Sequence, residues 1–122
     1  LRQLTEAITG RARLPISLTL EGQCNVPPDV QIAFYRVAQE ALNNVVKHAG
    51  ATQATVHVTC QAGTAKLTIS DNGTGFNPKN ISPDNLGLRI MRERAEAIGA
   101  GLTIESQPGH GTQVVVVWPD SQ

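Results

Sequence analysis

The order in which strand-like and helix-like hydrophobic patterns follow one another is the feature that most constrains how this chain can fold. Alternating or short continuous apolar runs, as expected of strands, lie at 16–20, 55–59, 65–71, 102–106 and 113–118. Apolar residues at helical spacing lie at 1–13, 30–48 and 86–98. This order predicts an α/β fold, a two-layer sandwich in which helices cover one face of a mixed sheet of about five strands.

Length, charge and cysteine content narrow the function classes. The 122 residues fit a single domain, 1–122, and the absence of an initial methionine indicates a piece of a longer protein. Lys plus Arg and Asp plus Glu both number 10, and this balance argues against direct binding of nucleic acid. The longest apolar run, Val114–Trp118, is too short to cross a bilayer. Cys24 and Cys60 have no metal-ligand spacing, so we expect reduced thiols in a cytoplasmic protein.

Polar residues form a stripe along the helix predicted at 30–48. At about 100° per residue, Arg36, Glu40, Asn44 and Lys47 fall on one side, opposite the apolar residues. One interpretation is the solvated face of an ordinary amphipathic helix. The other is a ligand site, because an amide oxygen and carboxylate-held water suit Mg²⁺ and a lysine can neutralise a phosphate.

Asp71 ends the strand predicted at 65–71, on the same face as the apolar Leu67 and Ile69. A carboxylate on an apolar face needs a partner, and the exocyclic amine of a ligand base would be one. The alternative is a hairpin, because Asn72-Gly73 is a strong turn signal. However, a loop with glycine and prolines at 74–85 follows the turn, where a hairpin would need a second strand.

Glycines recur at places where the backbone could approach a ligand. Gly87 stands in the first turn of the helix predicted at 86–98, whose free N–H groups could bind phosphate; taken alone, it reads more simply as an incidental helix-boundary glycine. Gly109-His110-Gly111-Thr112, taken alone, is a tight turn between strands. The largely polar segment Phe76–Leu86 buries little apolar area and is predicted to be a mobile lid.

Together, these motifs resemble the nucleotide-binding domain shared by gyrase, Hsp90, sensor histidine kinases and MutL. The matching segments are an N box at Glu40–His48 and three glycine boxes at Asp71–Gly75, Leu86–Leu88 and Gly109–Thr112. Lys47-His48 ahead of Ala49-Gly50-Ala51 is most similar to the histidine kinases. Tyr35–Asn44 and Met91–Ala95 resemble the branch that partners LuxR-type response regulators, and Ile90-Met91 resembles its nitrate/nitrite-sensor members.

The resemblance implies a Bergerat-type ATP-binding fold with ATP and Mg²⁺ as cofactors. Asp71 would accept a hydrogen bond from the adenine amine, Asn44 would bind Mg²⁺ with Glu40 acting through water, and Lys47 would lie near phosphate; Glu40, Asn44 and Lys47 form the implied catalytic set. The remaining implied nucleotide-binding residues are His48, Gly73, Gly75, Gly87, Leu88, Gly109, Gly111 and Thr112. Asn85-Leu86 replaces a glycine that the second box often has, which leaves fewer glycine turns for phosphates.

The implied function is transfer of the γ-phosphoryl group of Mg-ATP to a histidine in two-component signalling. None of His48, His57 and His110 resembles the acceptor, so we expect it on a dimerisation domain outside this chain. The implied partners are that domain and a response regulator, with a homodimeric, membrane-associated full-length protein whose kinase domain is cytoplasmic. Two alternatives stay open: an anti-sigma-type serine kinase of the same superfamily, and a non-catalytic nucleotide-binding regulatory module.

Overall fold

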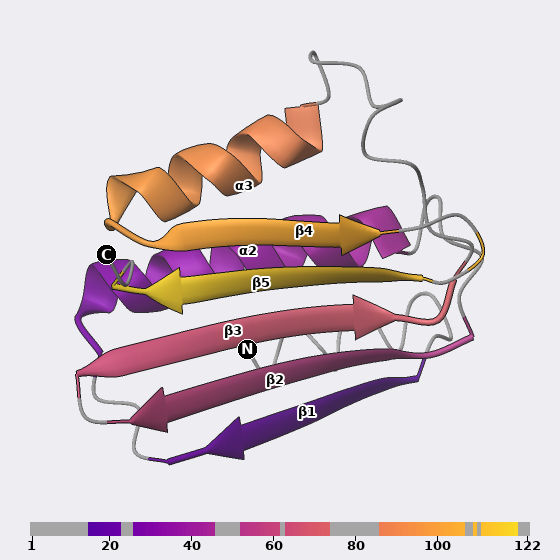
Figure 1. Cartoon of the computed structure of the whole chain (residues 1–122), viewed down its shortest axis with the longest axis horizontal. Helices are drawn as coiled ribbons and strands as arrows, with labels where there is room; N and C mark the ends of the chain where they lie inside the picture. Colours follow the sequence, from indigo (N-terminus) through magenta and orange to yellow (C-terminus); the bar gives the residue numbers. More distant parts are fainter. Residues whose placement is uncertain are drawn as a thin grey trace.

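The structure is a computed structural model that describes residues 15–22, 26–45, 52–61, 63–73, 86–106, 109 and 111–119 (Figure 1). Its elements are β1 (Ile16–Glu21), α2 (Pro28–Asn44), β2 (Ala54–Gln61), β3 (Thr64–Asp71), α3 (Leu86–Ala97), β4 (Gly101–Ser106) and β5 (Thr112–Trp118). The helix predicted at 1–13 lies outside the described residues. No helix in the described part of the chain is long and apolar enough to cross a membrane.

The strands form one five-stranded sheet in the order β1-β2-β3-β5-β4. β1 pairs with β2 in parallel, whereas β2 with β3, β3 with β5, and β5 with β4 pair antiparallel, so the sheet is mixed. Both described helices lie on one side of this sheet (Figure 1). The predicted two-layer α/β sandwich is therefore confirmed.

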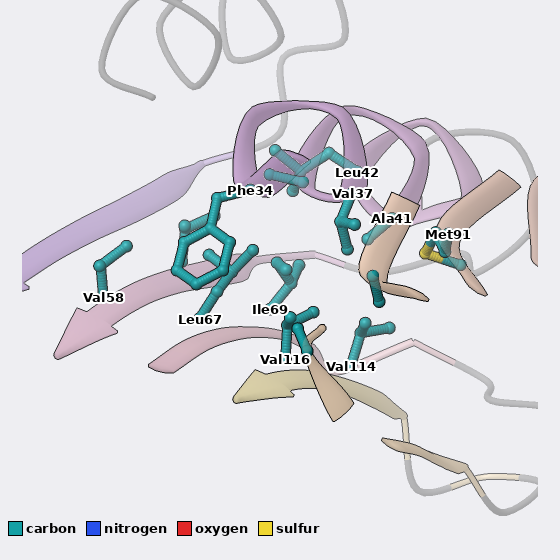
Figure 2. Close-up of a cluster of buried hydrophobic side chains, with 14 of the residues drawn as sticks. Phe34, Val37, Ala41, Leu42, Val58, Leu67, Ile69, Met91, Val114 and Val116 are labelled. Carbon is teal, nitrogen blue, oxygen red and sulfur yellow. The ribbon is translucent and has the colours of Figure 1, made fainter. Parts of the chain in front are cut away.

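The core lies between α2 and the middle of the sheet. On α2, the apolar positions Val30, Phe34, Val37, Ala38, Ala41 and Leu42 are buried. They meet the buried, alternating residues of the central strands, which register places side by side: Val58 with Leu67, and Leu67 with Val116. Figure 2 shows these side chains filling the space between helix and strands. Because alternate strand residues point to one face, the two-residue period in the sequence selects this packing.

The boundaries of the helices follow local chemistry. α2 starts at Pro28, where a proline costs nothing because N–H groups of the first turn have no partner within the helix. The Pro27 carbonyl accepts hydrogen bonds from the N–H groups of Val30 and Gln31 at 3.0 and 3.1 Å. α3 ends before Gly99, whose φ of +70° reverses the chain and lets the Ala100 N–H donate to the Ala95 carbonyl at 2.9 Å.

The expectation of two reduced cysteines is wrong for Cys60, which is disulfide-bonded. The other cysteine of the sequence, Cys24, lies outside the described residues. Parallel pairing of β1 with β2 brings the end of β1 beside the end of β2, so that Gly22 packs against the Cys60 carbonyl. Distance along the sequence therefore says nothing about which segments lie next to Cys60.

Replacing Leu67 by alanine is expected to cost about 2–5 kcal/mol of unfolding free energy, because Leu67 is completely buried and its removal leaves a cavity between α2 and the sheet. The matched control is Leu20→Ala, since Leu20 is 53% exposed and should lose about 0.5 kcal/mol or less. Urea denaturation measures both. Equal losses in the two variants would show that the core is not where the structure places it.

Candidate functional site

The polar stripe of α2 meets the first turn of α3. Glu40 and Asn44 lie one helical turn apart and are both half-buried. A Cβ atom added to Gly87 would lie 3.4 Å from Glu40 Oε2, 3.4 Å from Asn44 Nδ2 and 3.5 Å from Asn44 Oδ1. The structure thus brings three predicted site residues together. The backbone of Gly87, which has no side chain, lies beside the Glu40 carboxylate and the Asn44 amide.

Leu88, a predicted nucleotide-binding residue, and Arg36, a member of the predicted stripe, have different surroundings. Leu88 is partly buried and packs against the hydrophobic core, so its side chain supports the start of α3. Arg36, the N-terminal member of the predicted stripe, donates a hydrogen bond to Gln39 Oε1 at 3.2 Å and lies 5.9 Å from the centre of the Tyr35 ring. The stripe therefore contributes to the site only at its C-terminal end.

Asp71 is the last residue of β3 and is half-buried. Strand alternation places it on the same face as the buried Leu67 and Ile69, as predicted. Its Oδ1 accepts a hydrogen bond from the Gly73 N–H at 2.8 Å, which is the local turn that aspartate commonly forms. This bond orients the carboxylate through one of its two oxygens.

The start of β5 packs directly on Asp71. Register pairs Thr112 with Asp71 on one side and with Ser106 on the other. Gly111 has a φ of +78°, and a Cβ there would collide with the Asp71 carbonyl, so only glycine permits this approach. Gly109 also has a positive φ, of +83°, and none of the described residues lies within 4 Å of its Cβ position; its predicted role in nucleotide binding stays a prediction.

Ser106 is a member of this cluster that the sequence did not reveal. Its Oγ donates to the Gly111 carbonyl at 3.1 Å and lies 2.9 Å from Thr112 Oγ1. A serine hydroxyl has one proton, so Thr112 donates to Ser106 when Ser106 donates to Gly111. The pair fixes the hydroxyl of Thr112 beside Asp71.

Asn72 is a second such residue. The sequence indicated only a turn at Asn72-Gly73. In the structure, Asn72 Oδ1 accepts hydrogen bonds from the N–H groups of Thr52 at 2.9 Å and Gln53 at 3.0 Å, and its Nδ2 donates to Thr52 Oγ1 at 2.7 Å. Asn72 therefore joins the glycine turn to the segment that leads into β2.

The remaining predictions divide between residues that the structure describes and residues that it does not. Lys47, His48, Gly75 and the segment predicted to be a lid up to Asn85 lie outside the described residues. His57 lies on β2, 3.3 Å from Glu21 Oε1 without hydrogen-bond geometry, and it pairs with Thr68, three residues before Asp71. The expectation that His57 is not a phosphoryl acceptor stays a prediction.

Two further observations concern possible metal and ligand sites in the described part of the chain. Within the described ranges, no group of three or more His, Cys, Asp or Glu residues could hold a metal ion by itself. Glu40 and Asn44 would therefore hold Mg²⁺ only together with water or ligand oxygens, as Mg²⁺ commonly is held. A groove of ≈ 870 Å³ at the other end of α2 is lined by Leu20, Ile32 and Tyr35 among others, and it includes none of the predicted site residues.

Comparison with known proteins identifies relatives of this chain. Residues 29–122 match the family described as histidine kinase-, DNA gyrase B-, and HSP90-like ATPase. The chain is 37% identical over 108 residues to the sensor protein VraS of Staphylococcus epidermidis, which covers 88% of this chain and 31% of VraS. The chain thus spans less than a third of that relative's length.

Solved structures share the fold. The histidine kinase domain of the Erythrobacter litoralis EL346 blue-light activated histidine kinase superposes with a TM-score of 0.76 and 25% identity, covering 97% of this chain and 58% of that one. Full-length ShkA in complex with AMPPNP superposes with a TM-score of 0.82 at 20% identity, covering 97% of this chain and 28% of that one.

The predicted resemblance is confirmed by a family match that extends from the start of α2 to the end of the chain. It includes the stripe of α2, the turn after β3, the start of α3 and the start of β5, which are the segments that the fold assembles around Asn44 and Asp71. The chain therefore belongs to the histidine kinase-, DNA gyrase B-, and HSP90-like ATPase family.

Proposed function

We propose that this chain is the catalytic, ATP-binding domain of a sensor histidine kinase. The observation that carries the proposal is the contact between the first turn of α3 and the polar end of α2, where Gly87 faces Glu40 and Asn44. In a chain of this ATPase family, that contact places a helix N-terminus next to the residues suited to a hydrated metal ion.

Different residues of the chain would bind the base, the metal ion and the phosphates of Mg-ATP. One oxygen of Asp71 is taken by the Gly73 N–H, which leaves the other to accept from the adenine amine. Asn44 would bind Mg²⁺ directly and Glu40 through water, and the N–H groups at the start of α3 would bind phosphate. Bound Mg²⁺ would supply charge neutralisation on the phosphates.

Phosphoryl transfer then depends mainly on position and charge, because this domain forms no covalent bond in the step: the N–P bond would form on the acceptor histidine as the bond from the γ-phosphorus to ADP breaks. The acceptor histidine is proposed to lie in the dimerisation domain of the longer protein, since VraS extends far beyond the matched segment. The proposed partners are that domain and a LuxR-type response regulator, in a membrane-associated homodimer with this domain in the cytoplasm. The serine-kinase and non-catalytic alternatives make different predictions below.

Replacing Asp71 by asparagine is expected to weaken ATP binding about 10- to 100-fold, or about 1.4–2.8 kcal/mol. The Gly73 N–H requires the oxygen of the new amide, so the NH₂ group would face the adenine amine, donor against donor. Asp29→Asn is the control, because Asp29 is exposed in the first turn of α2 and asparagine keeps its hydrogen bond from the Val30 N–H. Calorimetry that gives equal affinity for wild type and Asp71→Asn would refute the role of Asp71.

Replacing Asn44 by alanine should weaken binding of Mg-ATP by about 10-fold or more and change binding of metal-free ATP by less than about 2-fold, because a metal ligand is lost while the base contact stays. The control is Asn43→Ala, which alters the adjacent position about 100° around the helix. Titrations of ATP with magnesium and with EDTA measure the effect. Unchanged magnesium dependence would make Asn44 an ordinary helix-face residue.

The isolated chain should not label itself with γ-³²P-ATP, but should label the dimerisation domain of its own full-length protein when that domain is added. The reason is that His48, His57 and His110 fall in the N box, on a strand and in a glycine turn, and none of them resembles the acceptor. Phosphohistidine is acid-labile and alkali-stable, whereas phosphoserine has the opposite stability. Acid-stable label would support the serine kinase, and binding of ATP with no label on either component would support the non-catalytic module.

A further inference from the structure

We propose that Asn72 is a positioning residue, which fixes the direction in which the chain leaves Asp71 and so aims the carboxylate that contacts the nucleotide. The expected effect of Asn72 on ATP binding rests on the proposed function. The link from Asn72 to the geometry of Asp71 does not rest on the proposed function.

The hydrogen bonds of Asn72 are non-local. A turn asparagine ordinarily bonds to the backbone two residues further on. Here all the side-chain hydrogen bonds that the described residues show go to Thr52 and Gln53, at sequence separations of 20 and 19 residues. The backbone N–H of Asn72 also donates to the Gln53 carbonyl at 3.3 Å. Asn72 is thus a clamp between two segments.

The orientation of the Asn72 amide is determined by its partners. Backbone N–H groups can only donate, so the atom that receives the N–H groups of Thr52 and Gln53 must be Oδ1. Nδ2 is then left to donate to Thr52 Oγ1. Both polar atoms of the side chain are engaged, and rotation of the amide would place donors against donors.

The hydrogen bonds of Asn72 lie where they limit the direction of the chain that follows Asp71. Ala54 paired with Asp71 is the last pair of the β2–β3 ladder at this end, and Asn72 holds the two residues that precede Ala54. Gly111 packs against the Asp71 carbonyl from the other side, so the chain after Asp71 is confined on both sides. The Gly73 N–H can reach Asp71 Oδ1 at 2.8 Å only while the chain leaves β3 in this direction.

The test compares Asn72→Ala with Asn72→Asp. Aspartate keeps an oxygen for the two N–H groups and a second oxygen that can accept from the Thr52 hydroxyl, so it should retain ATP affinity within about 2-fold. Alanine removes all these bonds and should weaken ATP binding by about 10-fold. If Asn72→Asp loses as much affinity as Asn72→Ala, the hydrogen bonds of the clamp are not what matters.

A double-mutant cycle separates positioning from general destabilisation. If Asn72 acts through Asp71, adding Asn72→Ala to Asp71→Asn should change ATP affinity by less than about 2-fold, because the aimed contact is already lost. Fully additive losses would overturn the proposal. If Asn72→Ala fails to fold, Asn72→Ser keeps one hydroxyl acceptor and takes its place, with an intermediate loss expected.

Amide hydrogen exchange tests the structural part without nucleotide. Asn72→Ala should increase the exchange rate of the Gly73 N–H, which donates to Asp71, and leave the core amide of Leu67 unchanged, whereas Asn72→Asp should protect Gly73 as wild type does. Unchanged Gly73 exchange in Asn72→Ala would refute the proposal. If wild type binds no ATP, the proposed function fails, and Gly73 exchange alone decides the role of Asn72.

Discussion

The packing of α2 on the middle of the sheet is the constraint on which the site depends. Val37, Ala41 and Leu42 are almost completely buried, so α2 cannot rotate about its axis without moving apolar side chains into water. Glu40 and Asn44 consequently keep one orientation, toward the first turn of α3. The hydrophobic core thus sets the direction of the polar groups, and the polar groups need few contacts of their own to stay in place.

The site also depends on places where the backbone lies close to side chains or backbone of another element. The backbone of Gly87 lies next to Glu40 and Asn44 at the start of α3, and Gly111 allows β5 to begin against Asp71. A methyl group at 111 would collide with the Asp71 carbonyl, whereas one at 87 would make ordinary contact with two polar side chains. These glycines bring groups from different elements together without contributing side chains.

Sequence reasoning predicted the layers, the strands and the place of Asp71, because two-residue and helical periodicities report directly on which face is buried. It missed the roles of Ser106 and Asn72, because their partners are set by strand register: Ser106 faces Thr112 across the β4–β5 pair, and Asn72 reaches back to Thr52. The sequence pattern did not predict the disulfide bond of Cys60 for the same reason. A pattern along the chain shows which residues face the core, but not which segments become neighbours.

The parallel pairing of β1 has a consequence for the order of events in folding. Ile16 pairs with Ala54, across a span that includes all of α2, whereas Gln61 pairs with Thr64 across a short turn. Closing the long loop costs more chain entropy, so β2 and β3 can pair before β1 joins them at the edge. β1 lies at the edge of the sheet, where its neighbour is β2. Transient loss of β1 would leave Asp71 paired with Ala54 and Thr112, so this end of the sheet keeps its geometry while the edge opens.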